Sequence, residues 1–177
     1  MASPIAISVD PEPITEGWSE YALDDGSTIW FKLVVTRVQV HFSTSDRSGP
    51  PIGIGVTGNP QVVVKSRPED MGEAETVPDD VASSAKRLSI GFHSTNAEPW
   101  NYYRLVGAPA GLEYIKVRNT VINVYRIEGH YDKEGSPLYF VQQSSAGGPA
   151  PPDEVRAALQ RAASTITSAP PTMKGGS

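Results

Sequence analysis

The chain has 177 residues, no cysteine and a formal net charge of −5 at neutral pH. The absence of cysteine excludes disulfides, thiolate metal sites and a cysteine nucleophile. The acidic balance, with lysine and arginine scattered along the chain, argues against nucleic-acid binding, which normally needs a basic face. Glycine and proline number 16 each, and this richness favours short strands joined by tight turns over a helical bundle.

The N-terminal stretch, residues 1–13, has neither the basic region nor the apolar region of a signal peptide. No apolar run in the chain approaches the length of a membrane span. The sequence therefore predicts a protein of the cytoplasm, or of a particle assembled there, without a membrane span.

The first β elements are a short strand, a turn and a long strand. Tyr21 and Leu23 alternate on the short strand, and the Asp-Asp-Gly at residues 24–26 is a strong hairpin signal. In the long strand, residues 28–42, the apolar positions change from odd to even near Thr36. Because side chains alternate faces, this change requires a bulge or a sharp bend. The expected inward-facing residues are Ile29, Phe31, Leu33, Val35, Val38, Val40 and Phe42.

A type I turn with a bulged glycine is expected next, at residues 46–51. It leads to two returning strands, residues 52–56 and 61–65. The following stretch, residues 67–86, is acidic and nearly free of large apolar residues, so it predicts a linker or long loop. A patch that docks a basic partner is the alternative for this stretch.

The same pattern then recurs, which suggests an internal duplication. Residues 88–92 form an expected strand, whose counterpart in the first copy is residues 5–9. The second long strand changes parity near Val121 and Ile122, as the first does near Thr36. Its returning strand is residues 138–141, after which the copies are expected to diverge. The matches at an offset of 82 positions are Trp18/Trp100, Tyr21/Tyr103 and Leu23/Leu105, and those at 86 are Ile29/Ile115, Val35/Val121, Val38/Val124, Asp46/Asp132, Gly49/Gly135, Pro51/Pro137 and Ile52/Leu138.

The C-terminal part predicts one helix, at residues 153–167, after a stiff proline-containing spacer. Its apolar residues recur at helical spacing on one narrow face, so the helix must pack on its own chain or on another one. The two alternatives stay open. This face consists of Val155, Ala158, Leu159, Ala162 and Ile166.

Catalytic and ligand-binding motifs are weak. His41, His93 and His130 lack the spacing of a metal motif, although His130 stands near Asp132 and Glu134 on the second turn. No nucleophile elbow or phosphate-binding loop is present, and the glycines of residues 53–58 fit an edge strand better. The sequence therefore predicts no enzyme, no cofactor and no metal site.

Tyrosines that do not repeat between the copies favour a contact surface, because exposed tyrosine is typical of protein interfaces and of sugar platforms. Ordinary cross-strand pairing is the alternative. Together with four helix residues they form the predicted partner-binding set, which is Tyr102, Tyr114, Tyr125, Tyr131, Tyr139, Val155, Leu159, Ala162 and Ile166.

The predicted architecture is an all-β protein of tandem duplicated small barrels or sandwiches with one C-terminal helix. The expected divisions are residues 1–66 and 87–146 for the β units, 67–86 for the linker, 147–167 for the spacer and helix, and 168–177 for a disordered tail. The favoured function is a non-catalytic structural or accessory subunit in a homo-oligomer or larger assembly. Alternatives are a β module that binds a small ligand or glycan through the second copy's tyrosines, and an unfamiliar hydrolase or metal enzyme.

Overall fold

The computed structural model describes residues 4–43, 47, 49–74, 86–109, 111–164 and 170. Their strands form one nine-stranded antiparallel sheet, so the all-β class is confirmed. The elements in chain order are β1 (Ile5–Thr15), β2 (Ser19–Leu23), β3 (Thr28–Phe42), β4 (Gly53–Lys65), the 3-10 helix η1 (Pro68–Asp70), β5 (Arg87–Ile90), β6 (Phe92–Ser94), β7 (Trp100–Val106), β8 (Tyr114–Tyr131), β9 (Pro137–Pro149) and the helix α2 (Pro152–Ser164).

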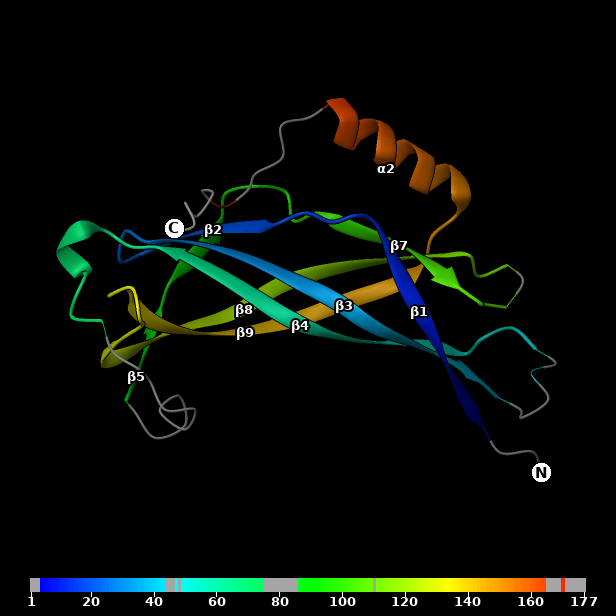
Figure 1. Ribbon diagram of the computed structural model, residues 1–177, viewed down its shortest axis with the longest axis horizontal. Helices are drawn as coiled ribbons and strands as arrows, with labels where there is room; N and C mark the ends of the chain where they lie inside the picture. The colour runs from blue at the N-terminus through cyan, green and yellow to red at the C-terminus, as the bar shows by residue number, and fades with distance from the viewer. Residues whose placement is uncertain are drawn as a thin grey trace.

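The strands fall into two halves in chain order, β1–β4 in the first half and β5–β9 in the second. Strand β1 joins these two halves (Figure 1). Its first half, from Ile5 to Val9, pairs with the end of β3, and its second half pairs with β7. Strands β5 and β6 join the two halves a second time, because β5 pairs with β8 of the second half and β6 pairs with β2 of the first. Only Gly91 separates β5 from β6, so the strand predicted for residues 88–92 is interrupted there.

Both long strands contain a bulge at equivalent positions. Along β3 the pairing with β4 skips Thr36, and along β8 the pairing with β9 skips Ile122. The predicted changes of parity are confirmed by these two bulges. Ile122 is the bulged residue of β8 and is 51% exposed.

Strands β4 and β9 are longer than the sequence indicates. The predicted break between residues 56 and 61 is wrong, because β4 runs without interruption beside β3. The end predicted at Val141 is also wrong, because β9 continues to Pro149 beside the first half of β8. A strand that hydrogen-bonds along its whole length tolerates polar and glycine residues when one face is open to water.

Most of the buried apolar residues of both halves belong to one hydrophobic cluster, and a second, smaller cluster lies under α2. All seven residues predicted to face inward from β3 are buried, and Tyr21, Tyr103 and Ile115 lie in the same cluster. The two halves therefore share a core in the described residues.

In each half a buried tyrosine lies near a glutamate carboxylate of the other half. The Tyr21 hydroxyl donates to Glu98 Oε1 at 2.5 Å and accepts from the Val121 N–H at 3.2 Å. Burial and the Glu98 carboxylate raise the pKa of Tyr21 to about 12. In the reverse direction, burial and the nearby Glu16 carboxylate raise the pKa of Tyr103. The Tyr103 hydroxyl forms no hydrogen bond of normal geometry with a described residue.

Helix α2 packs on its own chain, outside the sheet (Figure 1). Val155 and Ala158 are buried against Tyr102. Glu154 Oε1 accepts hydrogen bonds from the Tyr102 hydroxyl at 3.0 Å and from Lys116 Nζ at 2.7 Å. Packing against the sheet stabilises a helix that is too short to be stable alone. Within the described residues, no helix has the length and apolarity needed to cross a membrane.

Candidate functional site

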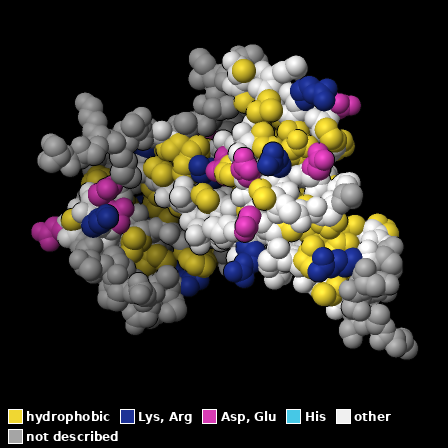
Figure 2. All heavy atoms as spheres, turned by 45° about the vertical axis from the view of Figure 1, so that its right-hand side comes forward, with side chains coloured by type: hydrophobic (Ala, Val, Ile, Leu, Met, Phe, Trp, Pro, Cys, Tyr) yellow, Lys and Arg dark blue, Asp and Glu magenta, His cyan; other side chains and the backbone are white. Residues whose placement is uncertain are grey.

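An apolar cavity of about 970 Å³ lies where the β3–β4 hairpin meets the loop between β7 and β8 and the end of β9. Apolar side chains and glycine or proline backbone form its walls. The larger apolar members are Ile7, Phe42, Ile52, Ile54 and Leu112. Figure 2 brings this side of the molecule forward and shows hydrophobic side chains gathered at its lower right.

Turn residues keep this cavity open. Gly107 and Gly111, both in the β7–β8 loop, have φ angles of 78° and 86°, a conformation that residues with a side chain rarely adopt. Gly53 and Gly148 also line the cavity, and a Cβ atom built on either would meet no heavy atom within 4 Å. The absence of four side chains leaves a volume that an ordinary packed core would fill.

Arg47 is the only charged residue among the described residues that line the cavity. It lies in the tip of the β3–β4 hairpin with a φ angle of 56°, and its side chain is exposed. A single cation at an apolar wall favours a ligand that combines apolar groups with a carboxylate or another anion.

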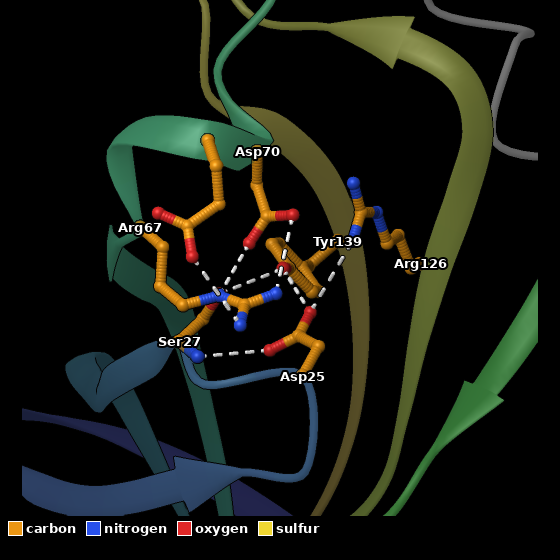
Figure 3. A network of polar contacts seen from close by, with 7 residues as sticks. Asp25, Ser27, Arg67, Asp70, Arg126 and Tyr139 are labelled. Carbon is orange, nitrogen blue, oxygen red and sulfur yellow. Dashed lines mark hydrogen bonds and ion pairs between the residues drawn. The ribbon is translucent and has the colours of Figure 1, made fainter.

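The other end of the sheet, at the β8–β9 hairpin, is filled by polar contacts instead (Figure 3). Asp25, in the β2–β3 turn, accepts a 2.5 Å hydrogen bond from the Tyr139 hydroxyl through Oδ2 and a 2.9 Å bond from the Ser27 N–H through Oδ1. Arg126 of β8 lies 3.7 Å from the same Oδ2. The turn of the first half is thereby fixed to two strands of the second.

The pKa values at this end follow from these contacts. Burial alone raises the pKa of Asp25, but the bonds from Tyr139 and Ser27 and the charge of Arg126 outweigh it, so the pKa lies below its usual range. Burial and the bond to Asp25 raise the pKa of Tyr139 to about 12. Both groups therefore keep the charge state that the network needs at neutral pH, and the arrangement is suited to structure more than to proton transfer.

The segment that follows β4 covers the β8–β9 hairpin. Arg67 and Asp70 form a two-point ion pair, with Nε to Oδ2 at 2.8 Å, beside the β2–β3 turn (Figure 3). The Gly72 N–H then donates to the Gly135 carbonyl oxygen at 2.8 Å, and the Ser136 hydroxyl contacts the Met71 sulfur at 3.6 Å. This part of the predicted linker is thus bound to the sheet.

The predicted contact tyrosines lie inside the structure or partly inside it. Tyr102 is 2% exposed beneath α2, and Tyr114 packs against the same cluster. Tyr125 is half-buried beside Phe140, and Tyr139 belongs to the polar network. Their partners are strands and α2, so the structure does not bring the five tyrosines together on one face.

Tyr131 and the predicted helix residues differ in exposure. Tyr131 is half-buried and lies against Gly72. Val155 is buried, whereas Leu159 is 46% exposed and Ala162 is exposed. Ile166 lies outside the described residues, as does the predicted tail except Pro170.

The weak metal and catalytic candidates are placed as follows. Asp132 Oδ1 accepts hydrogen bonds from the backbone N–H groups of Glu134 and Ser136, which stabilise the turn. In the part of the chain that the structure describes, no three His, Asp or Glu side chains are placed to hold a metal ion. Ser89, which lacks the first glycine of a nucleophile elbow, is exposed on β5.

The sequence did not reveal which residues form the cavity at one end of the sheet and the polar network at the other. Asp25 was interpreted only as a turn residue, and the lining of the cavity comes from segments far apart in the chain. The excess of glycine and proline in those segments was the one visible signal. Compared with known protein families, curated proteins and solved structures, the chain gives no match.

Proposed function

We propose that the protein is a non-catalytic structural or accessory subunit that assembles with other protein chains, first of all with copies of itself. The observation that carries this proposal is the apolar end of the sheet at the β3–β4 hairpin. There, an apolar cavity opens beside Ile52, which is 64% exposed. Pro50 and Pro51 line the same cavity, and Pro50 is exposed. Contiguous exposed apolar surface of this kind marks interaction sites in soluble proteins.

The mass of the protein in solution tests this proposal. Sedimentation equilibrium over a wide range of concentrations should give a mass that rises above the 19.0 kDa of one chain. Ile52→Asp should reduce the mass to that of one chain at the same concentrations, because a carboxylate in an apolar contact loses its hydration. The matched control is Ile122→Asp, which places the same charge on another exposed isoleucine, at the β8 bulge.

Two results would contradict the proposal. A mass of one chain at every concentration would remove the basis for self-assembly. An equal loss of assembly in Ile52→Asp and Ile122→Asp would show that added charge, and not this end of the sheet, is responsible.

The second candidate function is the binding of a small ligand in the same cavity. A volume of about 970 Å³ lies within the range of small-molecule sites. The lining includes none of the tyrosines, so it favours an apolar ligand over a glycan. Wild-type mass at one chain, together with a melting temperature that rises with an apolar ligand, would favour this alternative.

We also propose that the two halves are copies of one ancestral unit. The bulges at Thr36 and Ile122 support it, because they lie 86 positions apart, the offset of the sequence matches. Paired cations and tryptophans support it as well. Lys32 lies 4.8 Å from the Trp18 ring centre, and Arg118 lies 4.5 Å from that of Trp100.

A further inference from the structure

The two hairpin tips of the sheet differ in what covers them. In the tip between β8 and β9, Gly135 and Ser136 are buried, because Met71 and Gly72 lie on them. In the tip between β3 and β4, Gly49 and Pro50 are exposed. The second tip therefore has a covering segment, while no described residue plays that part at the first tip.

The difference follows from the two strands that lead away from these ends. After β4 the chain returns over the β8–β9 tip through η1. After β9 the chain instead turns into α2, which Glu154 holds against Tyr102 and Lys116 on the outside of the sheet. The space beside the β3–β4 tip is left as the cavity.

The β8–β9 end of the sheet contains polar side chains, whereas the equivalent positions at the β3–β4 end are apolar or glycine. Tyr139 stands opposite Arg126 in the β8–β9 ladder. At the offset of 86 positions their counterparts in the other half are Gly53 and Val40, and Val40 stands opposite Ile54. The tyrosine and the arginine at the covered end thus correspond to a glycine and an apolar residue at the other end. The cavity is lined mainly by apolar side chains and by glycine and proline residues.

We infer that this cavity receives a short segment of a neighbouring subunit, seated on the β3–β4 tip as residues 66–72 are seated on the β8–β9 tip, with apolar side chains on the floor and a carboxylate facing Arg47. The inference rests on the proposed assembly function and names the chemistry of its contact. Charge complementarity selects the occupant, because Arg47 is the one charged group among the described lining residues. The backbone of Gly49 is the counterpart of Gly135, whose carbonyl oxygen accepts the Gly72 N–H.

Selection from a phage library of random heptapeptides tests the inference on the intact protein. Peptides are selected on the wild type and counter-selected on Gly53→Trp and, separately, on Gly148→Trp. Both glycines line the cavity, and a Cβ atom at either position would meet no heavy atom within 4 Å, so we expect each tryptophan to be accepted and to obstruct the cavity. Ile122→Trp, remote from the lining, is the control.

We expect the selected peptides to combine apolar residues with Asp or Glu. Synthetic copies should bind the wild type and the control equally, and should bind both glycine variants weaker by about tenfold or more. Arg47→Gln should weaken the binding of the acidic peptides and leave their Asn or Gln versions unchanged. Melting temperatures of all variants, measured alongside, show that each is folded.

The inference is overturned if no selected peptide distinguishes the wild type from both folded glycine variants. It is also overturned if only a small molecule, the anionic aromatic dye 1-anilinonaphthalene-8-sulfonate, distinguishes the wild type from both glycine variants, because the cavity would then be a small-molecule site. Sedimentation of Gly53→Trp separates this inference from the proposed function. If this variant still assembles, the proposed function holds but the cavity is not the contact. If the wild type binds the peptides but stays a single chain, the cavity binds a peptide segment but self-assembly is refuted.

Discussion

Asp25 shows how one residue serves two purposes in this molecule. Its backbone lies in the tight β2–β3 turn, and its carboxylate joins that turn to Tyr139 and Arg126 of the other half. The hydrogen bonds and the cation favour the charged carboxylate, so its pKa is lowered although burial opposes this. A group with a lowered pKa makes the stability of the folded chain depend on pH.

Replacing Asp25 therefore changes the pH dependence of unfolding. In the unfolded chain the Asp25 carboxyl has a pKa of about 3.9, and in the folded chain its pKa is lower. The charged carboxylate therefore stabilises the folded chain fully at a pH above the unfolded pKa. This stabilisation is lost as the pH falls through the folded pKa. We expect Asp25→Asn to melt below the wild type at pH 7, with the difference shrinking as acid protonates the wild-type group. Thermal melting followed by circular dichroism, from pH 7 down through the pKa of the unfolded carboxyl, measures this difference in melting temperature. The control is Asp153→Asn, which removes a charge from an exposed position on α2, and a gap that stays constant with pH would refute this role of Asp25.

At the scale of elements, two substitutions in α2 test how this helix packs on the sheet. Val155 is 4% exposed against the sheet, and Leu159, on the same helix, is 46% exposed. We expect Val155→Ala to lower the free energy of unfolding by about 1–3 kcal/mol, because it leaves a cavity under the helix. Leu159→Ala should change it by about 0.5 kcal/mol or less, as an exposed substitution does. Urea unfolding measures both, and an equal loss for the two variants would contradict packing on the same chain.

The strands differ in how far the sequence predicts them. In β3 the alternation of apolar residues is strong, so its bounds, its inward face and its bulge at Thr36 could all be predicted. In β4 and β9 the open faces carry glycine, proline, serine and glutamine, which are also loop residues, so the extra length was missed. Helix α2 was predicted from its spacing, and its observed start at Pro152 lies one residue before the expected one.

The partners of strands and the candidate site were not predictable in the same way. Alternation tells which side chains share a face, but it does not tell which strand lies alongside, so the division of β1 between β3 and β7 was hidden. The same limit applies to Tyr102, whose burial depends on α2 coming to rest over β7. The cavity is assembled from four segments that are far apart in the chain, at residues 7, 42–54, 107–112 and 147–149, and no local pattern records that they meet.

At the scale of the whole molecule, each half completes the other. The second half of β1 pairs with β7, β6 pairs with β2, and Tyr21 bonds to Glu98. The main hydrophobic cluster contains core residues from both halves. If the halves descend from copies of one unit, as we propose, then the units are interlocked and do not stand side by side as independent bodies.

Production of residues 1–74 and 86–177 as separate polypeptides tests this interlocking most directly. Each is analysed alone and after co-expression, by sedimentation and by thermal unfolding. The account predicts that neither fragment alone gives a folded monomer. The first leaves the second half of β1 without β7, the second leaves β7 without β1 and β6 without β2, and both lose part of the shared core. The two together should form a one-to-one complex with a single cooperative transition. A folded monomer with its own cooperative transition, obtained from either fragment alone, would contradict it.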